Sequence, residues 1–269
     1  MGKLRVVGVI PARLASDRLP GKVLLTLGGK AMLHHVYDAA RASPLLDDLL
    51  VATDADEVRD YCARHAIPVR MTSAAHTSGT DRVREVMEHI PADVYVNIQG
   101  DEPLVEAEHL RLLIELFSRR AVSGSAADPP EEVQVSTLMT PLKHDDAGNP
   151  NVVKVVTDLR GRALYFSRSP IPFRRNADSP LHTFKHLGFY AYRREALRKF
   201  GELAPTGLEQ TERLEQLRFL VHGIPIHVAE TSLDTVGVDT REDWEEFARR
   251  WRERFPARAS LHPRVGSDS

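Results

Sequence analysis

The stretch LRVVGVIPARLASDRLPGK, residues 4–22, decides the fold. Its apolar run VVGVI stops at Pro11, and a short run of Val and Ile bounded by a breaker is typical of a central strand in a parallel sheet. The loop that follows carries Arg13, Arg18 and Lys22 beyond the carboxyl end of this strand, where parallel sheets bind their ligands. Because three cations gather there, we expect a phosphate-bearing ligand. The alternative interpretation is a solvated basic loop.

Strand-like and helix-like segments alternate through the first half of the chain. Such alternation predicts an α/β fold with a mostly parallel sheet covered by helices on both faces. The segment 121–132 has no periodic pattern of apolar residues, so we expect it to be a surface loop. The expected strands are 6–10, 48–53, 68–72 and 94–99, and the expected helices are 30–42, 55–65, a run from its cap at Ser78 to about Ile90, and a run from after Pro103 to Arg119.

The second half has a different pattern. Two strand-like runs, 152–158 and 163–168, are joined by Leu159-Arg160-Gly161, which predicts an antiparallel hairpin. We expect one domain over residues 1–255, with a smaller antiparallel subregion at 150–230, and a flexible tail over 256–269. The remaining expected elements are strands at 185–193 and 225–230, an amphipathic helix at 208–223 and a final helix at 241–255.

Composition excludes several classes of function. The 269 residues include 36 Lys and Arg against 38 Asp and Glu. The chain therefore lacks the surplus of basic residues that would indicate a nucleic-acid partner. The single cysteine, Cys62, leaves no intramolecular disulfide and no cysteine metal cluster. No apolar stretch approaches the roughly 18 residues that a membrane span needs, and Met1 leads directly into the first strand without a signal peptide. We therefore expect a cytoplasmic protein with no membrane partner.

Carboxylates follow another predicted strand. In NIQGDEP, residues 97–103, an apolar strand ends in Gln, Gly, Asp101 and Glu before a proline. Because Mg²⁺ takes oxygen ligands and is usually held by one or two carboxylates plus substrate phosphates, Asp101 is a candidate ligand. A simple turn is the alternative, since Gly, Asp and Pro favour turns. In TVGVDTRED, residues 235–243, Asp239 is either a second ligand or a helix cap.

Two common nucleotide-binding motifs are absent from the sequence. No GxGxxG follows the first strand, and neither Gly21-Lys22 nor Gly29-Lys30 has the Walker spacing or the Ser or Thr that follows it. Their absence argues against a dehydrogenase and against a P-loop nucleotidase.

Ordered motifs run through nearly the whole chain: IPARLASDRLPGK, VATD, HTSGTDR, VNIQGDEP, NPNVVKVV, ALYFSR, HLGFYAY, LEQTERLEQLR and GVDT. Together they resemble the cytidylyltransferases that activate acidic sugars, most closely the branch that uses 3-deoxy-manno-octulosonate (KDO). The resemblance implies a Rossmann-like nucleotidyltransferase fold, Mg²⁺ as cofactor and a homodimer. It also implies a reaction in which the anomeric hydroxyl of KDO attacks the α-phosphorus of CTP, pyrophosphate leaves, and CMP-KDO forms for lipopolysaccharide assembly.

The same resemblance implies the site residues. The catalytic residues would be Arg13, Arg18, Lys22, Asp101 and Asp239, with the two aspartates as metal ligands. CTP would be bound by Pro11, Ala12, Arg13, Ser16, Lys22, Thr80, Arg82 and Gln99. The sugar would be bound by Gln99, Arg168, His186, Tyr190, Glu215 and Gln216. Arg168 would pair with the KDO carboxylate, since a guanidinium contacts a carboxylate through two hydrogen bonds. The strand 185–192 and the neighbouring hairpin would contribute to the dimer contact.

Three alternatives to this function remain open. In the first, the acceptor is an amino-substituted KDO or another acidic sugar in place of KDO. In the second, the chain is an inactive nucleotide-binding relative, and in the third it is a nucleotidyltransferase that uses another base.

Overall fold

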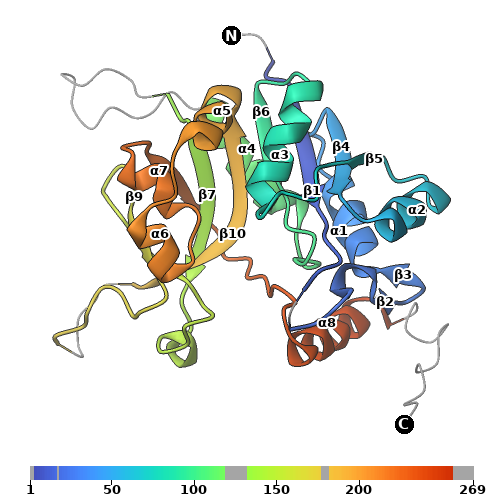
Figure 1. Cartoon of the computed structure of the whole chain (residues 1–269). Coiled ribbons are helices and arrows are strands. Elements are labelled where there is room, and N and C mark those ends of the chain that lie inside the picture. Colours follow the sequence, from blue (N-terminus) through green and yellow to red (C-terminus); the bar gives the residue numbers. More distant parts are fainter. Residues whose placement is uncertain (1–2, 17, 119–131, 177–181, 257–269) are drawn as a thin grey trace.

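A nine-stranded sheet with helices on both faces forms the protein, which is described by a computed structural model for residues 3–16, 18–118, 132–176 and 182–256 (Figure 1). The strands are β1 Val6–Pro11, β2 Thr26–Leu27, β3 Lys30–Ala31, β4 Asp48–Thr53, β5 Val69–Met71, β6 Val94–Asn97, β7 Val135–Pro141, β8 Lys154–Thr157, β9 Ala163–Ser167, β10 Phe184–Arg193 and β11 Ile226–Glu230. The α-helices are α1 Met32–Arg41, α2 Asp56–Arg64, α3 Gly79–His89, α4 Ala107–Ser118, α5 Arg194–Glu202, α6 Gly207–Glu212, α7 Leu217–Val221 and α8 Arg241–Arg254, with 3-10 turns η1 at Lys22–Leu24 and η2 at His144–Asp146.

The main path of the sheet has the strand order β11-β7-β10-β6-β1-β4-β5. Strand β1 is parallel to both of its neighbours, β4 and β6, and β7 is parallel to β11. Strand β10 runs antiparallel to β6 and β7, so six of these strands share one direction and only β10 opposes them. The predicted mostly parallel α/β fold is confirmed, as is the antiparallel hairpin formed by β8 and β9.

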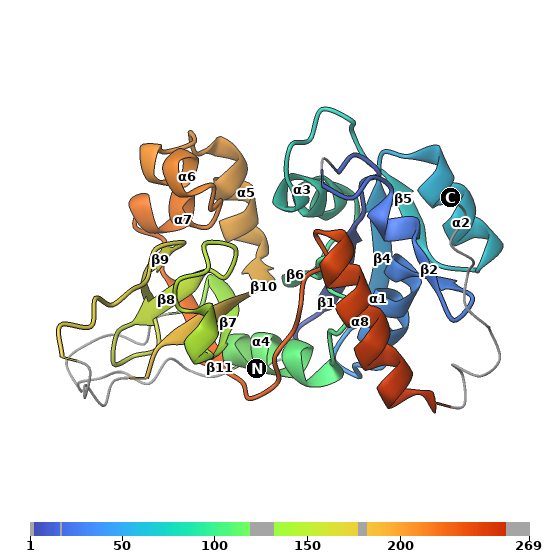
Figure 2. The same cartoon turned by 90° about the horizontal axis from the view of Figure 1, so that it is seen from below.

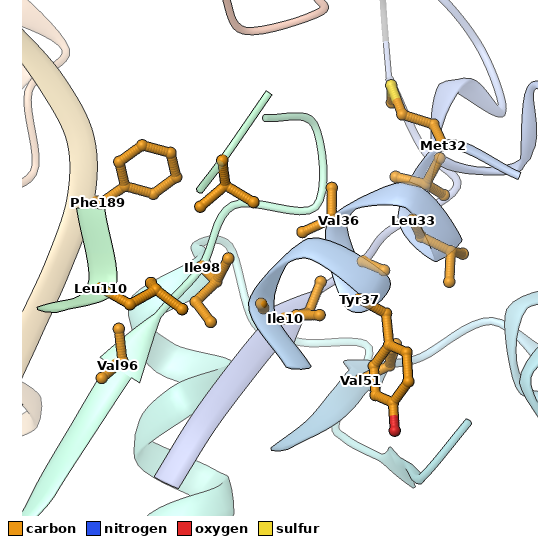
Figure 3. Packing of buried hydrophobic residues seen from close by; sticks show 14 of the residues in the cluster. Ile10, Met32, Leu33, Val36, Tyr37, Val51, Val96, Ile98, Leu110 and Phe189 are labelled. Carbon is orange, nitrogen blue, oxygen red and sulfur yellow. The ribbon is translucent and has the colours of Figure 1, made fainter. Parts of the chain in front are cut away.

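Strand β1 is buried on both faces, as its unbroken apolar run predicts. Val6 and Ile10 belong to one hydrophobic core, and Val7 and Val9, which point the other way, belong to a second. The first core lies between the sheet and helices α1, α4 and α8, and Figure 3 shows α1 packing its apolar side chains over Ile10 and Val51. The second core is covered by α3, α5 and α7. The central strand is therefore fixed from both sides, and its carboxyl end is a rigid place for a site.

Four features of the fold differ from the prediction. Strand β7 was not expected, although its sequence VSTLMTP contains three β-branched residues and its first six residues are buried. The predicted single helix at 208–223 is wrong: it is divided into α6 and α7, because Arg213 adopts a left-handed conformation with φ 51° that an α-helix cannot continue. Helix α4 begins at Ala107 after a turn that starts at Pro103, and a short β2–β3 hairpin precedes α1.

Two predicted segments fall outside the described residues. The expected loop at 121–132 is described only at residue 132, and the expected tail at 256–269 only at residue 256. Within the described part of the chain, no helix combines the length and apolar character that a membrane crossing requires. Cys62 is fully buried in the first core, where burial raises the pKa of its thiol to about 11, so it is a packing residue as its isolation in the sequence suggests.

Candidate active site

The site lies where the carboxyl ends of β1 and β6 meet the amino-terminal half of β10. Val9 on β1 is level with Asn97 on β6, and Asn97 is level with Tyr190 on β10. Because β10 runs in the opposite direction, its residues before Tyr190 extend past the end of β6. His186 therefore reaches the same edge as the β1 loop, although the two segments are about 170 residues apart in sequence.

Two adjoining cavities open at this edge. The first has a volume of ≈ 630 Å³ and is lined by the β1 loop, the start of α3 and residues of the second half of the chain. The second has a volume of ≈ 600 Å³ and is lined mainly by β10, the α6–α7 region and the segment before α8. Both cavities share walls formed by Arg18, Gln99, Asp101, Asn151, Arg168 and Asp239. The two predicted metal ligands, Asp101 and Asp239, thus lie at the junction and line both cavities.

Close backbone packing brings the carboxylates to this junction. A Cβ atom on Gly100 would lie 2.6 Å from the carbonyl oxygen of Pro11, so only glycine allows the loop after β6 to lie against the end of β1. The carbonyl of Asp101 accepts a hydrogen bond from the amide of Val238 at 2.8 Å. The second contact holds the segment that carries Asp239 next to Asp101.

The ammonium of Lys22 lies between the two aspartates. It donates to Asp101 Oδ2 at 2.7 Å, to Asp239 Oδ1 at 2.8 Å and to the carbonyl oxygen of Val238 at 2.9 Å. Arg18 donates to the other carboxylate oxygen of Asp239 at 2.7 Å. Two of the three predicted phosphate-binding cations are therefore paired with the predicted metal ligands, and the third, Arg13, lines the first cavity.

Burial and charge act in opposite directions on this cluster. Burial favours the neutral form of Lys22, which is only 8% exposed, but the carboxylates of Asp101 and Asp239 outweigh it and raise the pKa of the ammonium. For Asp239, burial raises the pKa, and the ammonium of Lys22 and the guanidinium of Arg18 lower it below its usual value. The cluster is thus composed of ionised groups held together by their opposite charges.

The local role of Asp239 is decided by its neighbour. Thr240 is the N-cap of α8, because its side chain accepts from the amide of Asp243, and Asp243 Oδ2 accepts in return from the amide of Thr240. Asp239 is therefore not the cap, and its carboxylate faces Lys22 and Arg18. The alternative of a capping aspartate is excluded.

The residues expected to bind CTP divide between the two cavities. Pro11, Ala12, Arg13, Ser16, Lys22, Arg82 and Gln99 line the first cavity. Thr80 does not: it lines the second cavity and donates a short hydrogen bond to Glu215 Oε2. Arg82 is 3% exposed, and its guanidinium bonds to Thr72 Oγ1 at 2.7 Å and to Asp54 Oδ2 at 3.0 Å. Arg82 therefore holds the wall of the first cavity through the ends of β4 and β5.

The residues expected to bind the sugar all line the second cavity, and Gln99 and Arg168 line both. His186 is buried beside Thr137, whose Oγ1 lies 2.9 Å from His186 Nε2, and burial lowers the pKa of the imidazole to about 3. Glu215 is held by Thr80, and burial raises the pKa of its carboxyl group. His186, Tyr190, Glu215 and Gln216 make this cavity polar as well as partly aromatic.

Arg168 is engaged with backbone carbonyls. Its Nε donates to the carbonyl of Glu212 at 2.7 Å, and its terminal nitrogens donate to those of Pro150 at 2.9 Å and Arg213 at 3.4 Å. The carbonyl of Arg168 itself accepts from the buried ammonium of Lys154 at 2.9 Å. Its side chain thus connects β9 to the α6–α7 region, and its predicted pairing with a carboxylate remains a prediction.

Several residues of the cavities were not expected from the sequence. The first cavity also contains His76, Asn151 and Arg213, and the second also contains Glu102 and Lys185. Among the described residues, three buried atoms of the second cavity's lining residues have no hydrogen-bond partner: Asn97 Oδ1, Glu102 Oε2 and Tyr190 Oη. Four of the five unexpected residues lie within motifs quoted from the sequence, His76, Glu102, Asn151 and Arg213, and Lys185 directly precedes the motif HLGFYAY.

The donor set at the junction suits a hard divalent cation. Asp101 and Asp239 place carboxylate oxygens 2.7 and 2.8 Å from one cationic nitrogen, so their spacing already accommodates a positive charge. Nowhere in the described ranges do three or more His, Cys, Asp or Glu side chains cluster as metal ligands. A site of two carboxylates fits Mg²⁺ that completes its coordination with water and substrate phosphates.

Comparison with known proteins defines the class. A sequence model of the cytidylyltransferase family matches residues 7–229. A 3-deoxy-manno-octulosonate cytidylyltransferase from Koribacter versatilis is 52% identical over 242 residues, covering 90% of this chain and 88% of the relative. The protein of the same name from Acidobacterium capsulatum is 51% identical over 243 residues, covering 90% and 95%.

A solved structure shares the same architecture. The CMP:2-keto-3-deoxy-manno-octonic acid synthetase complexed with CTP has a TM-score of 0.84 and 39% identity, covering 93% of this chain and 99% of the other. The chain therefore belongs to the family of 3-deoxy-manno-octulosonate cytidylyltransferases. The predicted family and the nucleotidyltransferase fold are confirmed.

Proposed function

We propose that this protein transfers CMP from CTP to KDO. The anomeric hydroxyl of the sugar forms a bond to the α-phosphorus, the bond from this phosphorus to the bridging oxygen of the β-phosphate breaks, and pyrophosphate leaves with that electron pair. The single observation that carries the proposal is the junction of the two cavities, where Asp101 and Asp239 line both. A nucleotide in one cavity and a sugar in the other would meet at this point.

The residues of the first cavity suit a nucleoside triphosphate. Phosphoryl-type transfer needs positioning and charge neutralisation more than covalent chemistry from the protein. Arg13, Arg18 and Lys22 would hold the phosphates and stabilise the charge that develops on departing pyrophosphate. Ser16 would add a hydrogen bond from the same loop.

Mg²⁺ is proposed as the cofactor, held by Asp101 and Asp239. When bound, it would neutralise phosphate charge and lower the pKa of the attacking hydroxyl. The chain's own contribution is to fix the two carboxylates through Lys22, Arg18 and the amide of Val238.

The residues of the second cavity suit a polyhydroxylated acid. Glu215, Gln216, His186 and Tyr190 offer hydrogen-bonding groups on one wall, and Lys185 offers a cation beside them. Because burial lowers the pKa of His186 to about 3, its ring stays neutral at physiological pH and acts as a hydrogen-bonding group without charge. The product, CMP-KDO, would serve lipopolysaccharide assembly. An amino-substituted KDO, or another acidic sugar, is the second candidate acceptor, because these groups accept either an ammonium or a hydroxyl.

The test is release of pyrophosphate by the purified protein with CTP, Mg²⁺ and KDO. We expect turnover with KDO, none without sugar, and much slower turnover with UTP or GTP. Release of pyrophosphate with amino-substituted KDO but not with KDO would reassign the acceptor. Equal use of UTP and CTP would contradict a cytidine site. No release of pyrophosphate with any sugar would indicate an inactive relative.

A substitution tests the role of Asp101. Asp101→Asn should reduce turnover by about a hundredfold or more, since electrophilic stabilisation by a metal is worth several kcal/mol. Asp145→Asn removes the same charge at a fully exposed position of η2 and should leave turnover unchanged. Near-normal turnover of Asp101→Asn, with the fold intact by circular dichroism, would remove Asp101 from the mechanism.

A further inference from the structure

The guanidinium of Arg213 lies in the wall of the first cavity without a role. Six cationic side chains line this cavity: Arg13, Arg18, Lys22, Arg82, Arg168 and Arg213. Four of them are already paired, since Arg18 and Lys22 bond to Asp239, Arg82 to Asp54, and Arg168 to backbone carbonyls. Of these six side chains, all of which the structure describes, only those of Arg13 and Arg213 make no hydrogen bond or ion pair.

These two guanidiniums come from opposite halves of the molecule. Arg13 follows β1, whereas Arg213 lies between α6 and α7, which occupy the half away from β4 and β5 (Figure 2). Both side chains belong to exposed residues and line the same cavity. A polyanion in that cavity would thus meet an uncommitted cation from each side.

The backbone at Arg213 is held in an unusual conformation. Its φ of 51° lies in the left-handed region, which costs a non-glycine residue energy and persists only where surrounding contacts impose it. Those contacts are visible, because Arg168 donates to the carbonyls of both Glu212 and Arg213. The guanidinium of Arg168 therefore fixes the backbone at Arg213, and the guanidinium of Arg213 is left without a partner.

We propose that Arg213 binds the triphosphate of the nucleotide from the second half of the molecule. The inference rests on the proposed use of CTP and adds a residue to it. A phosphate is favoured over the sugar carboxylate because Arg213 lines the first cavity, with Arg13, Ser16 and Lys22, and not the second. Arg213 bonds to phosphate oxygens that the β1 loop does not cover, and a guanidinium can contact two of them at once.

Equilibrium binding separates this inference from the proposed function. Arg213→Gln should weaken the binding of CTP about tenfold, the usual effect of losing one charge-assisted hydrogen bond, and leave the binding of CMP within twofold. Arg213→Lys should lie between wild type and Arg213→Gln. The control is Arg252→Gln, which removes the same charge at an exposed position of α8 outside both cavities and should bind CTP as wild type does.

Three outcomes would overturn the inference. Equal CTP affinity of Arg213→Gln and Arg252→Gln would show that Arg213 makes no phosphate contact. Unchanged CTP affinity with a raised KM for KDO would assign Arg213 to the sugar carboxylate. If the wild-type protein did not bind CTP, both the inference and the proposed function would fail. This outcome differs from the first two because it is seen in the protein without any substitution. Arg213→Gln keeps an L-residue at the same φ and should keep the wild-type Tm. An unchanged Tm excludes unfolding as the cause of weaker CTP binding.

Discussion

At the scale of single residues, the site contrasts ionised with neutral groups. In the charged cluster of Lys22, Asp101 and Asp239, the two carboxylates raise the pKa of the Lys22 ammonium, and this ammonium lowers the pKa of Asp239 against the effect of burial. In the second cavity, His186 is buried, and burial lowers the pKa of its ring. The first arrangement suits phosphates and a metal, whereas the second suits uncharged hydroxyl groups.

The neutral His186 predicts how stability depends on pH. Its pKa is about 3 in the folded protein and 6.5 in the unfolded chain, so the unfolded state binds more protons between these values. The free energy of unfolding should therefore fall as the pH falls below 6.5, and this one group should account for about 2 kcal/mol between pH 7 and pH 5. Urea unfolding of wild type and His186→Gln at both pH values measures the difference.

The substitution His144→Gln is the matched control, because that imidazole on η2 is fully exposed. We expect its pH dependence to follow that of wild type, while that of His186→Gln is flatter. Parallel curves for wild type and His186→Gln would contradict a neutral, buried imidazole.

At the scale of elements, helix α8 orients Asp239, one of the two proposed metal ligands. Its N-terminal capping box is formed by Thr240 and Asp243, and Asp243 Oδ2 also accepts from the amide of Asp239 at 3.0 Å. The cap thus stabilises the helix and orients the residue just before it. We therefore expect changes in this cap to affect both stability and turnover.

Removing the capping hydroxyl tests this coupling. Thr240→Ala should lower the free energy of unfolding by about 1 kcal/mol, the usual cost of an N-cap loss. It should also lower turnover, because Asp239 loses part of its support. Thr240→Ser keeps the hydroxyl and should retain both properties. Urea unfolding measures the stability, and pyrophosphate release measures the turnover. A loss of stability with unchanged turnover would show that the cap does not position Asp239.

Elements with a strong local pattern could be predicted from sequence. The runs in β1, β4 and β6 are apolar because both faces are buried, and α1 and α8 show a helical repeat of buried residues. The single helix predicted over 208–223 was wrong because its apolar repeat continues through Arg213, while the break depends on Arg168, which is 45 residues away. Local periodicity contains no information about such a contact.

The same limit applies to the site. The β1 loop and the segment 99–103 were expected at the edge of the sheet because parallel strands end there. Lys22 could not be paired with Asp239 from sequence, since 217 residues separate them. The location of Thr80 in the second cavity likewise depends on Glu215, which arrives with the α6–α7 region.

At the scale of the whole molecule, the hairpin β8–β9 has an apolar surface. Leu159 in its turn and Leu164 on β9 are 107% and 62% exposed, and Phe173 beyond β9 is 87% exposed. Strand β10 is paired on both sides, so it has little free backbone edge for a partner. The predicted dimer would therefore use the hairpin side chains, because large apolar groups in water favour association.

Sedimentation equilibrium tests this dimer. Wild type should sediment as a dimer, and Leu164→Asp should shift it toward monomer, because a carboxylate would be buried in the contact without a partner. Met71→Asp is the control, since Met71 is 40% exposed on β5 at the far end of the sheet. A monomeric wild type, or a dimer that withstands Leu164→Asp, would rule out association through this hairpin.

The contact between Lys22 and Asp239 also has a consequence for synthesis of the chain. Strands β1, β4, β5 and β6 lie within the first 97 residues, so much of the sheet is available early during translation. The charged cluster is not, because Asp239, the second of the two carboxylates that bond Lys22, is added 217 residues after the lysine. We therefore expect a ribosome that has made most of this protein to have made most strands of the sheet before the proposed site is complete, because the segment before α8 supplies the second carboxylate.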